Sequence, residues 1–304
     1  MNYTNYIPPI FYKAFLFVIL FAHFSFAQNQ TENKIDSLKN QLSQTKSPQL
    51  KNQLLNSIAI SYIYSFPSEG IVFAEEAIKI SQKENLLKET AMSYETLGKL
   101  YLIQLNYEKS KQAFIQSAKI FHEIKALNSY WNVRRQIGQV HYEMGDYPKA
   151  ISIYFDVLKY YEQTKNNIGK ATVLNNIGVL FHRQNNIPKA IEYYQKGIQL
   201  LTQNKGIKGE IYCRLQTNMG LSYSSLQHYS KAKDCFLNSL KENEKIDNLY
   251  IYTINIGNLA ATYAGLKDYS TSEKYFKEAI EKSKEMNNFQ SIAVNYGDLG
   301  NLYL

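Results

Sequence analysis

Three asparagines recur at an interval that suits a binding surface. Asn176, Asn218 and Asn258 follow one another at nearly equal spacing, and each stands two positions ahead of a small residue. Because an asparagine side chain carries both donors and an acceptor, a row of such amides can satisfy the unpaired N–H and C=O groups of an extended peptide. Arg135 and Lys99 occupy nearby positions of the same pattern and add positive charge for a carboxylate. The alternative is that these amides bond only a neighbouring helix or water.

Residues that could perform catalysis or hold a metal do not fall into a recognisable arrangement. The five histidines and two cysteines form no H-E-x-x-H element and no Cys/His pair at zinc-ligand spacing. The sequence also lacks a glycine-rich phosphate loop and a G-x-S-x-G element. His141 and His182 fall at or beside positions where aromatic residues recur, so packing is their expected role. We predict no enzyme, no metal site and no cofactor; a hydrolase or metal enzyme is the least favoured alternative.

A nine-residue motif recurs along the chain and indicates the elements that position the asparagines. The copies are NYEKSKQAF from Asn106, DYPKAISIY from Asp146, NIPKAIEYY from Asn186, HYSKAKDCF from His228 and DYSTSEKYF from Asp268. Successive copies begin about 40 residues apart and always end in an aromatic residue, which predicts a repeat architecture. Gly, Asp and Asn residues precede Pro148 and Pro188, as at a turn into a helix. Each copy therefore opens the second helix of a helical hairpin.

Small residues recur at two further positions of this period. The first set is Gly98, Gly138, Gly178, Gly220 and Ala260; the second, twelve positions later, is Ser110, Ala150, Ala190, Ala232 and Ser272. Glycine inside a helix costs about 1 kcal/mol relative to alanine, so four glycines need a reason, and a close crossing of two antiparallel helices supplies one. The aromatic residue four positions after the second small residue fills the space beside this crossing. The pattern predicts an all-α solenoid of antiparallel hairpins whose first helices line the inner surface.

These positions resemble the tetratricopeptide repeat family. The match includes an aromatic residue three positions after the first small one, namely Tyr101, Phe181, Tyr223 and Tyr263, with His141 in its place in one copy. The resemblance implies a right-handed superhelical solenoid that binds proteins or peptides, in which asparagine at this inner position holds the ligand's backbone or terminal carboxylate. The family's basic period is about 34 residues, so we place the extra residues in a lengthened second helix ended by Asn or Gly caps. The lengthened form resembles sensory or peptide-binding arrays of bacteria.

The chain divides into a signal peptide at 1–27, a capping helix or linker at 28–50 and an array at 51–304. Intact repeats are expected at 91–130, 131–170, 171–212, 213–252 and 253–292. A degenerate repeat is expected at 51–90, because Ile58 occupies the small position, and an incomplete one at 293–304.

The two ends of the array differ from its middle. Ile35, Leu38 and Leu42 lie on one face of the expected capping helix. The last segment restarts the repeat at Gly300 and then stops. We expect the natural protein to continue beyond residue 304; the alternative is an unpaired final helix.

The N-terminus has the organisation of a secretory signal. Lys13 precedes the apolar stretch AFLFVILFA, and the small residues Ser25 and Ala27 follow. An apolar core of about nine residues is too short to span a bilayer. We predict cleavage after Ala27 and export, to the periplasm or the exterior of a bacterial cell. The alternative is an uncleaved anchor, and a membrane partner is expected only in that case or if the chain continues.

Composition and charge narrow the remaining possibilities. A hydrophobic content of 45% and a charged content of 20% are typical of a folded protein. The formal net charge is +8, but lysines alternate with glutamates and no basic block occurs, so nucleic acid is not an expected partner. Cys213 and Cys235 fall on paired helices about one turn out of step, and we expect two free, buried thiols rather than a disulfide.

Two functions are compatible with the sequence. The first is an exported, non-enzymatic scaffold that binds a peptide or protein segment in its concave groove through Asn176, Asn218, Asn258, Arg135 and Lys99. The alternative is the extracytoplasmic sensory region of a longer signalling protein, such as a histidine kinase or a DNA-binding regulator, that extends past residue 304.

Overall fold

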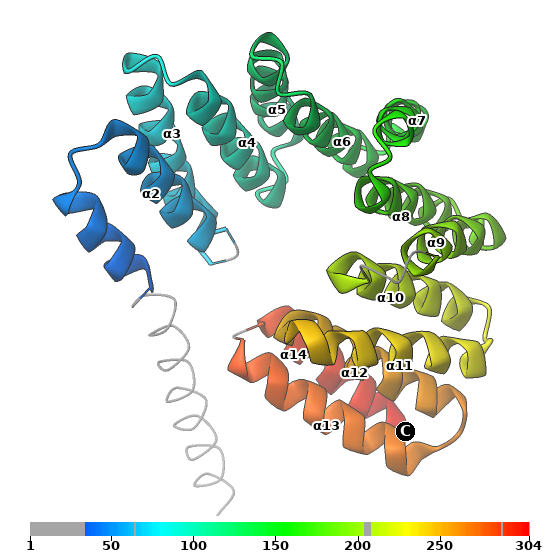
Figure 1. Ribbon diagram of the computed structural model, residues 1–304. Coiled ribbons are helices and arrows are strands. Elements are labelled where there is room, and N and C mark those ends of the chain that lie inside the picture. Colours follow the sequence, from blue (N-terminus) through cyan, green and yellow to red (C-terminus); the bar gives the residue numbers. More distant parts are fainter. Residues whose placement is uncertain (1–33, 64, 204–207, 287, 304) are drawn as a thin grey trace, which may run out of the picture. The chain divides into compact units, whose positions relative to one another are not determined.

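The computed structural model describes residues 34–63, 65–203, 208–286 and 288–303, and every regular element in these ranges is an α-helix (Figure 1). A helix at 34–44 comes first. It is followed by α2 (Pro48–Ser61), α3 (Pro67–Lys83), α4 (Leu87–Ile103), α5 (Tyr107–Glu123), α6 (Leu127–Glu143), α7 (Tyr147–Gln163), α8 (Asn167–Arg183), α9 (Ile187–Thr202), α10 (Gly209–Ser225), α11 (Tyr229–Ile246), α12 (Leu249–Gly265), α13 (Tyr269–Glu285) and α14 (Phe289–Leu302). The predicted all-α class is confirmed; the predicted signal peptide lies outside the described residues.

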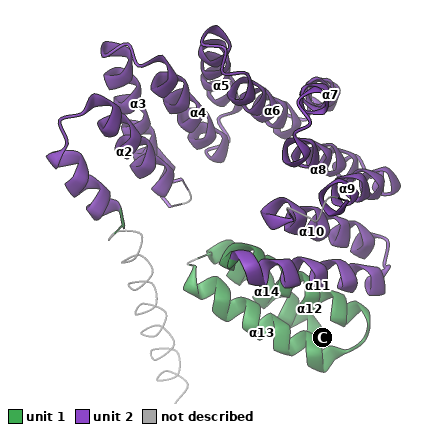
Figure 2. Ribbon diagram, in the orientation of Figure 1, with its two compact units in different colours: residues 1–34, 247–304 green, residues 35–246 purple. Residues whose placement is uncertain are grey.

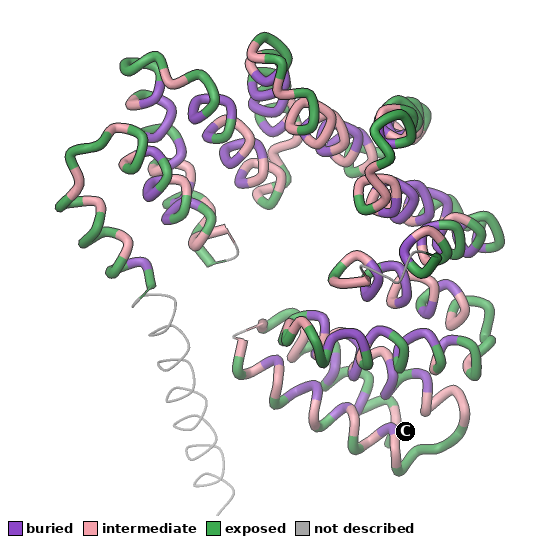
Figure 3. The backbone as a smooth tube through the Cα atoms, in the orientation of Figure 1, coloured by how far each residue is buried: buried purple, intermediate pink, exposed green. Residues whose placement is uncertain are grey.

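Two compact units make up the chain (Figure 2). Residues 35–246 form one unit, in which α2 to α11 each pack against the next helix. The other unit contains α12, α13 and α14, which also pack in sequence. Buried residues lie along the helix faces that meet neighbouring helices (Figure 3).

Short linkers of uniform construction join successive helices, and the one between α4 and α5 shows how they are built. Gln104 ends α4, Leu105 has a φ of +59° and Asn106 precedes α5. The Asn106 N–H donates to the Tyr101 carbonyl oxygen at 2.9 Å, and the Asn106 side chain accepts from the Lys109 N–H at 3.3 Å. A Schellman helix end thus leads directly into a side-chain N-cap.

The left-handed position of this linker recurs after nearly every helix of the described chain. It is occupied by Asn85, Leu105, Lys125, Gly145, Lys165 and Asn185, and then by Gln227, Asp247 and Lys267. Linkers within a hairpin and between hairpins are therefore alike, and each repeat consists of two similar halves. The prediction that the second helix alone is lengthened is wrong, because α4 and α5, like α6 and α7, have 17 residues each.

From α4 onward, each first helix begins four positions ahead of the repeat boundary that the sequence suggested. α4 begins at Leu87 instead of 91, and the same offset holds through α14, which begins at Phe289 instead of 293. α2 begins at Pro48, inside the segment expected to be a cap or linker. Asn166, Asn248 and Asn288 cap the starts of α8, α12 and α14 with their side chains, whereas α4, α6 and α10 begin without a side-chain cap.

Each of the four hairpins from α4–α5 to α10–α11 is held by an aromatic ring that lies on a glycine of the partner helix. A Cβ added to Gly98 would lie 2.7 Å from the Phe114 ring, and one added to Gly138 would lie 2.7 Å from the Tyr154 ring. Gly178 faces Tyr194 and Gly220 faces Phe236 in the same way. The second small residue lies at the same crossing: Ser110 Oγ donates to the Gly98 carbonyl oxygen at 2.8 Å. The predicted close approach is confirmed.

The first hairpin has a large residue at the position of the glycine and a small residue at the position of the ring. Ile58 stands where later repeats have glycine, and Ala74 stands where they have the aromatic ring; both are fully buried. Gly70 supplies the close approach, because a Cβ there would lie 2.7 Å from the Ala59 carbonyl oxygen. The repeat predicted as degenerate is therefore a packed hairpin with the large residue moved to its first helix.

The helix at 34–44 packs on the beginning of the array. Ile35 is 3% exposed, and the Lys39 ammonium lies 5.9 Å from the centre of the Tyr62 ring and 5.8 Å from that of Phe73. A cation over two aromatic faces is a stabilising contact. This contact lies between the helix at 34–44 and residues of α3 and the α2 C-cap.

Gly98→Ala is expected to destabilise the protein, although alanine is the better helix former. The added methyl group must displace the buried Phe114 ring, and overpacking of this kind costs about 1–3 kcal/mol. Gly297→Ala in α14 is the matched control, because no described atom lies within 4 Å of its added Cβ. That variant should gain up to about 1 kcal/mol. Urea unfolding followed by circular dichroism measures both, and a stabilised Gly98→Ala variant would contradict the ring-on-glycine contact.

Leu105→Gly is expected to raise the melting temperature. Leu105 is 69% exposed and adopts a left-handed conformation that costs a residue with a Cβ about 1–2 kcal/mol. Glycine relieves this strain and loses about 0.5–1 kcal/mol through its more flexible unfolded chain. The reciprocal variant Gly145→Ala, at the equivalent position with a φ of +79°, should melt at a lower temperature. Thermal scans showing the opposite order would refute the equivalence of the two linkers.

Candidate functional site

The residues predicted to bind a ligand all lie on first helices and are all half-buried. Lys99 is on α4, Arg135 on α6, Asn176 on α8 and Asn218 on α10, within the unit of residues 35–246. Asn258 is on α12, in the other unit. The candidate site within residues 35–246 therefore contains the first four.

Asn176 and Asn218 both bond to a neighbouring helix. Asn218 Nδ2 donates to Asn175 Oδ1 on α8 at 2.8 Å, and the Asn176 side chain hydrogen-bonds the hydroxyl of Tyr154 on α7. These are the interhelical bonds that the alternative interpretation expects. An amide has capacity for about four hydrogen bonds, so each side chain can also take part in another contact.

Lys99 is neutralised by its own helix. Its ammonium lies 2.7 Å from Glu95 Oε1, one turn earlier on α4. The same carboxylate oxygen accepts from Gln136 Nε2 on α6 at 2.8 Å. Because Glu95 is already close to both groups, Lys99 offers a ligand little net charge.

Arg135 has a different environment. Its Nη2 donates to Asn132 Oδ1 at 3.1 Å, one turn earlier on α6. Burial lowers the pKa of its guanidinium, while the nearby Tyr154, Tyr161 and Glu95 act in the opposite direction. An arginine remains a cation at neutral pH under such conditions, with most of its five N–H donors left for other partners.

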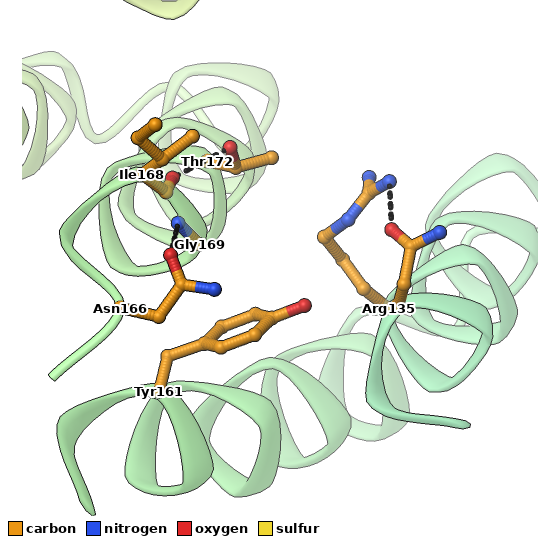
Figure 4. A pocket seen from close by; sticks show the side chains of 7 residues that line it. Arg135, Tyr161, Asn166, Ile168, Gly169 and Thr172 are labelled. Carbon is orange, nitrogen blue, oxygen red and sulfur yellow. Dashed lines mark hydrogen bonds between the residues drawn. The ribbon is translucent and has the colours of Figure 1, made fainter. Parts of the chain in front are cut away.

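A cavity of about 330 Å³ opens beside Arg135 (Figure 4). Asn132 and Arg135 of α6 line it, together with Tyr161 of α7. Residues of the α8 N-terminus complete it, namely Asn166, Ile168, Gly169 and Thr172. The Tyr161 hydroxyl and the Arg135 guanidinium point into the same space (Figure 4). The cavity is a small, polar depression formed by three consecutive helices.

Sequence reasoning identified Arg135 but not the residues around it. Asn166 is the N-cap of α8, since its Oδ1 accepts from the Gly169 N–H at 2.9 Å. A Cβ added to Gly169 would lie 2.7 Å from the Tyr161 ring, which explains glycine in the first turn of α8. Gly169 was the only sign in the sequence of a close contact between α7 and α8. The repeated motif describes a single hairpin, so it does not predict contacts between successive hairpins.

Aromatic rings continue from the cavity across the ends of α5, α6 and α7. Tyr161 lies 5.5 Å from Tyr160, and Tyr160 stacks on Trp131 at 5.3 Å between centroids. Trp131 meets Tyr130 edge-on at 5.1 Å, and Tyr130 lies 5.2 Å from His122. Trp131 is the only tryptophan in the chain. The cavity therefore has a continuous aromatic surface beside it.

The histidines and cysteines have structural surroundings. His182 Nδ1 lies 2.8 Å from the fully buried Ser222 Oγ, and His141 is 5% exposed, as expected for packed side chains. Burial lowers the pKa of both rings. Cys213 and Cys235 are free and buried, in line with the sequence prediction. Burial raises the pKa of the Cys235 thiol to about 12.

Two features are absent from the described residues. Within them, no group of three His, Cys, Asp or Glu side chains could hold a metal ion. Among the same residues, no helix combines the length and the apolar character that crossing a membrane requires.

Comparison with known proteins places the chain among repeat proteins. Tetratricopeptide repeat profiles match residues 126–203, 169–241 and 256–293, just over half of the sequence. No curated protein matches the sequence. Solved structures of tetratricopeptide type are similar in fold.

NprR in complex with its cognate peptide NprX has a TM-score of 0.59 at 17% identity, over 96% of this chain and 84% of that one. The apo form of RapI has a TM-score of 0.60 at 17% identity, over 88% and 99%. BtubC (BKLC) from P. vanneervenii has a TM-score of 0.60 at 15% identity, over 73% and 93%. At these identities the likeness concerns the fold, and it confirms the predicted solenoid of hairpins. The chain belongs to the tetratricopeptide repeat family.

Proposed function

We propose that this protein is an exported, non-enzymatic scaffold that binds an extended peptide or protein segment along its first helices. The observation that carries the proposal is the cavity at Arg135, because it is a depression next to a half-buried cation on the helix face where the sequence pattern predicts a ligand. The similar fold of NprR, solved with its cognate peptide, supports the same use of the array.

Binding would use the hydrogen-bonding capacity of the first helices. An extended segment presents one N–H and one C=O per residue, and a half-buried amide can bond either group. Asn176 lies beside Tyr154, which in turn lies near Arg135, so amide and cation are neighbours. Lys99 contributes little to ligand binding, because Glu95 neutralises its charge. If the chain is instead the sensory region of a longer signalling protein, the same helices would hold its ligand.

A bead library tests this function. Fluorescently labelled full-length protein is incubated with beads that each carry one random decapeptide attached through its N-terminus. The protein should be retained on a subset of beads. The double variant Asn176→Ala/Asn218→Ala should bind those beads about 10- to 30-fold more weakly, because each lost hydrogen bond is worth about 1 kcal/mol. Asn238→Ala, on the exposed side of the second helix α11, is the matched control and should bind normally.

Stability has to be followed in the same experiment. Removing Asn218 leaves the buried Asn175 without this partner, so the double variant should melt at a lower temperature. Binding is therefore compared at a temperature where circular dichroism shows every variant fully folded. Retention of the wild type on no beads, or equal retention of the double variant, would refute the proposal.

Export has its own test. We propose that residues 1–27 direct secretion and are removed. Expression of the full gene in a bacterial host should yield extracytoplasmic protein whose N-terminal sequence begins at Gln28. Recovery of the protein only in the cytoplasm, with Met1 or Asn2 at its start, would contradict this.

A further inference from the structure

Helix α14 exposes a helix face that earlier first helices bury. Seven and four positions ahead of the small residue, α8, α10 and α12 have buried side chains, namely Ala171 and Leu174, Cys213 and Gln216, and Thr253 and Ile256. The Cys213 thiol shows what covers this face, because it donates to the Ser239 carbonyl oxygen of the second helix α11 at 3.4 Å. In α14 the equivalent residues, Ala293 and Tyr296, are exposed. Among the described residues, no second helix follows α14 to cover them.

Small residues and aromatic rings alternate along this exposed face, which we call the α14 stripe. It consists of Ala293, Tyr296, Gly300 and Tyr303, whose spacing of three, four and three places them on one side of the helix. Tyr296 is 49% exposed and Tyr303 is 63% exposed. No described atom lies within 4 Å of a Cβ added to Gly300, whereas the equivalent Gly220 lies against a ring. The ring-on-glycine contact of the earlier hairpins is therefore unmade at Gly300.

Helix α13 holds both rings of the α14 stripe, and the stripe itself carries no charge. The Tyr303 hydroxyl donates to Glu273 Oε1 at 2.6 Å, and the Lys284 ammonium lies 6.0 Å from the centre of the Tyr296 ring. Side chains held in this way lose less freedom when a partner binds. Asp298 is the only charged residue of α14 and lies two positions from both Tyr296 and Gly300, on the opposite side of the helix. Depletion of charge is typical of the centre of a protein interface.

The α14 stripe is complementary to itself. In an antiparallel pair of α14 helices related by a two-fold axis, residues at equal distances on either side of position 298 face each other. Tyr296 then meets Gly300 of the second copy, and Ala293 meets Tyr303 of the second copy. Each pair joins a ring to a small residue, and the symmetry makes each pair twice. A parallel pair would instead place each ring beside the same ring of the second copy.

We propose that this protein forms a symmetric dimer in which the α14 stripes of two copies pack antiparallel. A second copy is the occupant that the stripe fits, because the stripe supplies both the ring and the small residue of every contact. Two short helices form an interface at the lower end of the size range, so we expect a reversible dimer with a Kd of about 1–100 µM. The dimer does not depend on the proposed peptide-binding function.

Sedimentation equilibrium of the full-length protein, at concentrations spanning the expected Kd, tests the dimer. Gly300→Leu should be monomeric, because leucine occupies the space that the Tyr296 ring of the second copy needs. Its melting temperature, measured where all variants are monomers, should not fall, since no described atom lies within 4 Å of the added Cβ and leucine is the better helix former. This readout separates a lost dimer from a damaged fold.

Tyr296→Ser should raise the Kd of the dimer at least about tenfold, because each dimer then loses two rings from its interface. Val294→Ser is the matched control. Val294 is 56% exposed, but it lies two positions from Tyr296 and therefore on the opposite side of α14. This control should dimerise with the Kd of the wild type.

Cysteine cross-linking tests the antiparallel register. Protein with Ala293→Cys is mixed with protein with Tyr303→Cys and oxidised mildly. A disulfide-linked dimer should form in the mixture, because the two introduced thiols face each other. Neither variant should cross-link by itself, since its two thiols would lie at opposite ends of the helix pair. Cys213 and Cys235 are buried and are the same in every sample.

Three results would overturn the proposal. A wild-type protein that stays monomeric throughout leaves the α14 stripe to a different helix. A dimer that Gly300→Leu does not weaken forms through another surface, such as the apolar stretch 14–22, which every variant retains. Cross-linking of the Ala293→Cys variant by itself would mean that the two helices lie parallel.

Discussion

The contact between an aromatic ring of a second helix and a glycine of its first helix is the constraint on which the rest of the structure depends. Phe114 on Gly98, Tyr154 on Gly138, Tyr194 on Gly178 and Phe236 on Gly220 repeat one arrangement. The missing Cβ lets the ring reach the first-helix backbone, so that the ring is fully buried and the two helices cross at short range. In the first hairpin the sizes at these two positions are reversed, since Ile58 and Ala74 are both fully buried where later repeats have glycine and the ring.

Most of the fold could be predicted from the sequence, because the small and aromatic residues of this contact recur at a nearly constant interval. Small residues and aromatic residues that recur once per repeat reveal hairpins, their order and their facing sides. Helix limits could not be predicted as well, since they depend on linker geometry. Lys125 and Lys165 adopt a conformation that sequence rules assign to Gly or Asn, so the linkers that hold them left no compositional signal. For this reason the extra length was assigned to one helix when both helices share it.

The candidate site was harder to predict because its residues come from different hairpins. Arg135 was recognisable as a cation on a first helix. Its suitability for binding a ligand also depends on Tyr161 and Asn166, which line the same cavity. Lys99 was likewise predicted as a cation on a first helix, and Glu95, one turn away, neutralises its charge. Asn176 and Asn218 each support a helix contact in addition to any ligand contact. The sequence pattern of one helix predicts the face on which a side chain lies. The hydrogen bonds and ion pairs of that side chain depend on how the helices pack.

The uniform linkers have a consequence for how such a chain changes length. A segment taken from one described linker to the equivalent linker of the next hairpin ends in a residue of the same left-handed conformation and in the same backbone hydrogen bond at which it began. Duplication or loss of such a segment during gene recombination therefore rejoins compatible ends, and the neighbouring hairpins need no new turn. The number of hairpins, and with it the length of the array, can thus change by whole copies. The side chains on the first helices diverge independently of that number.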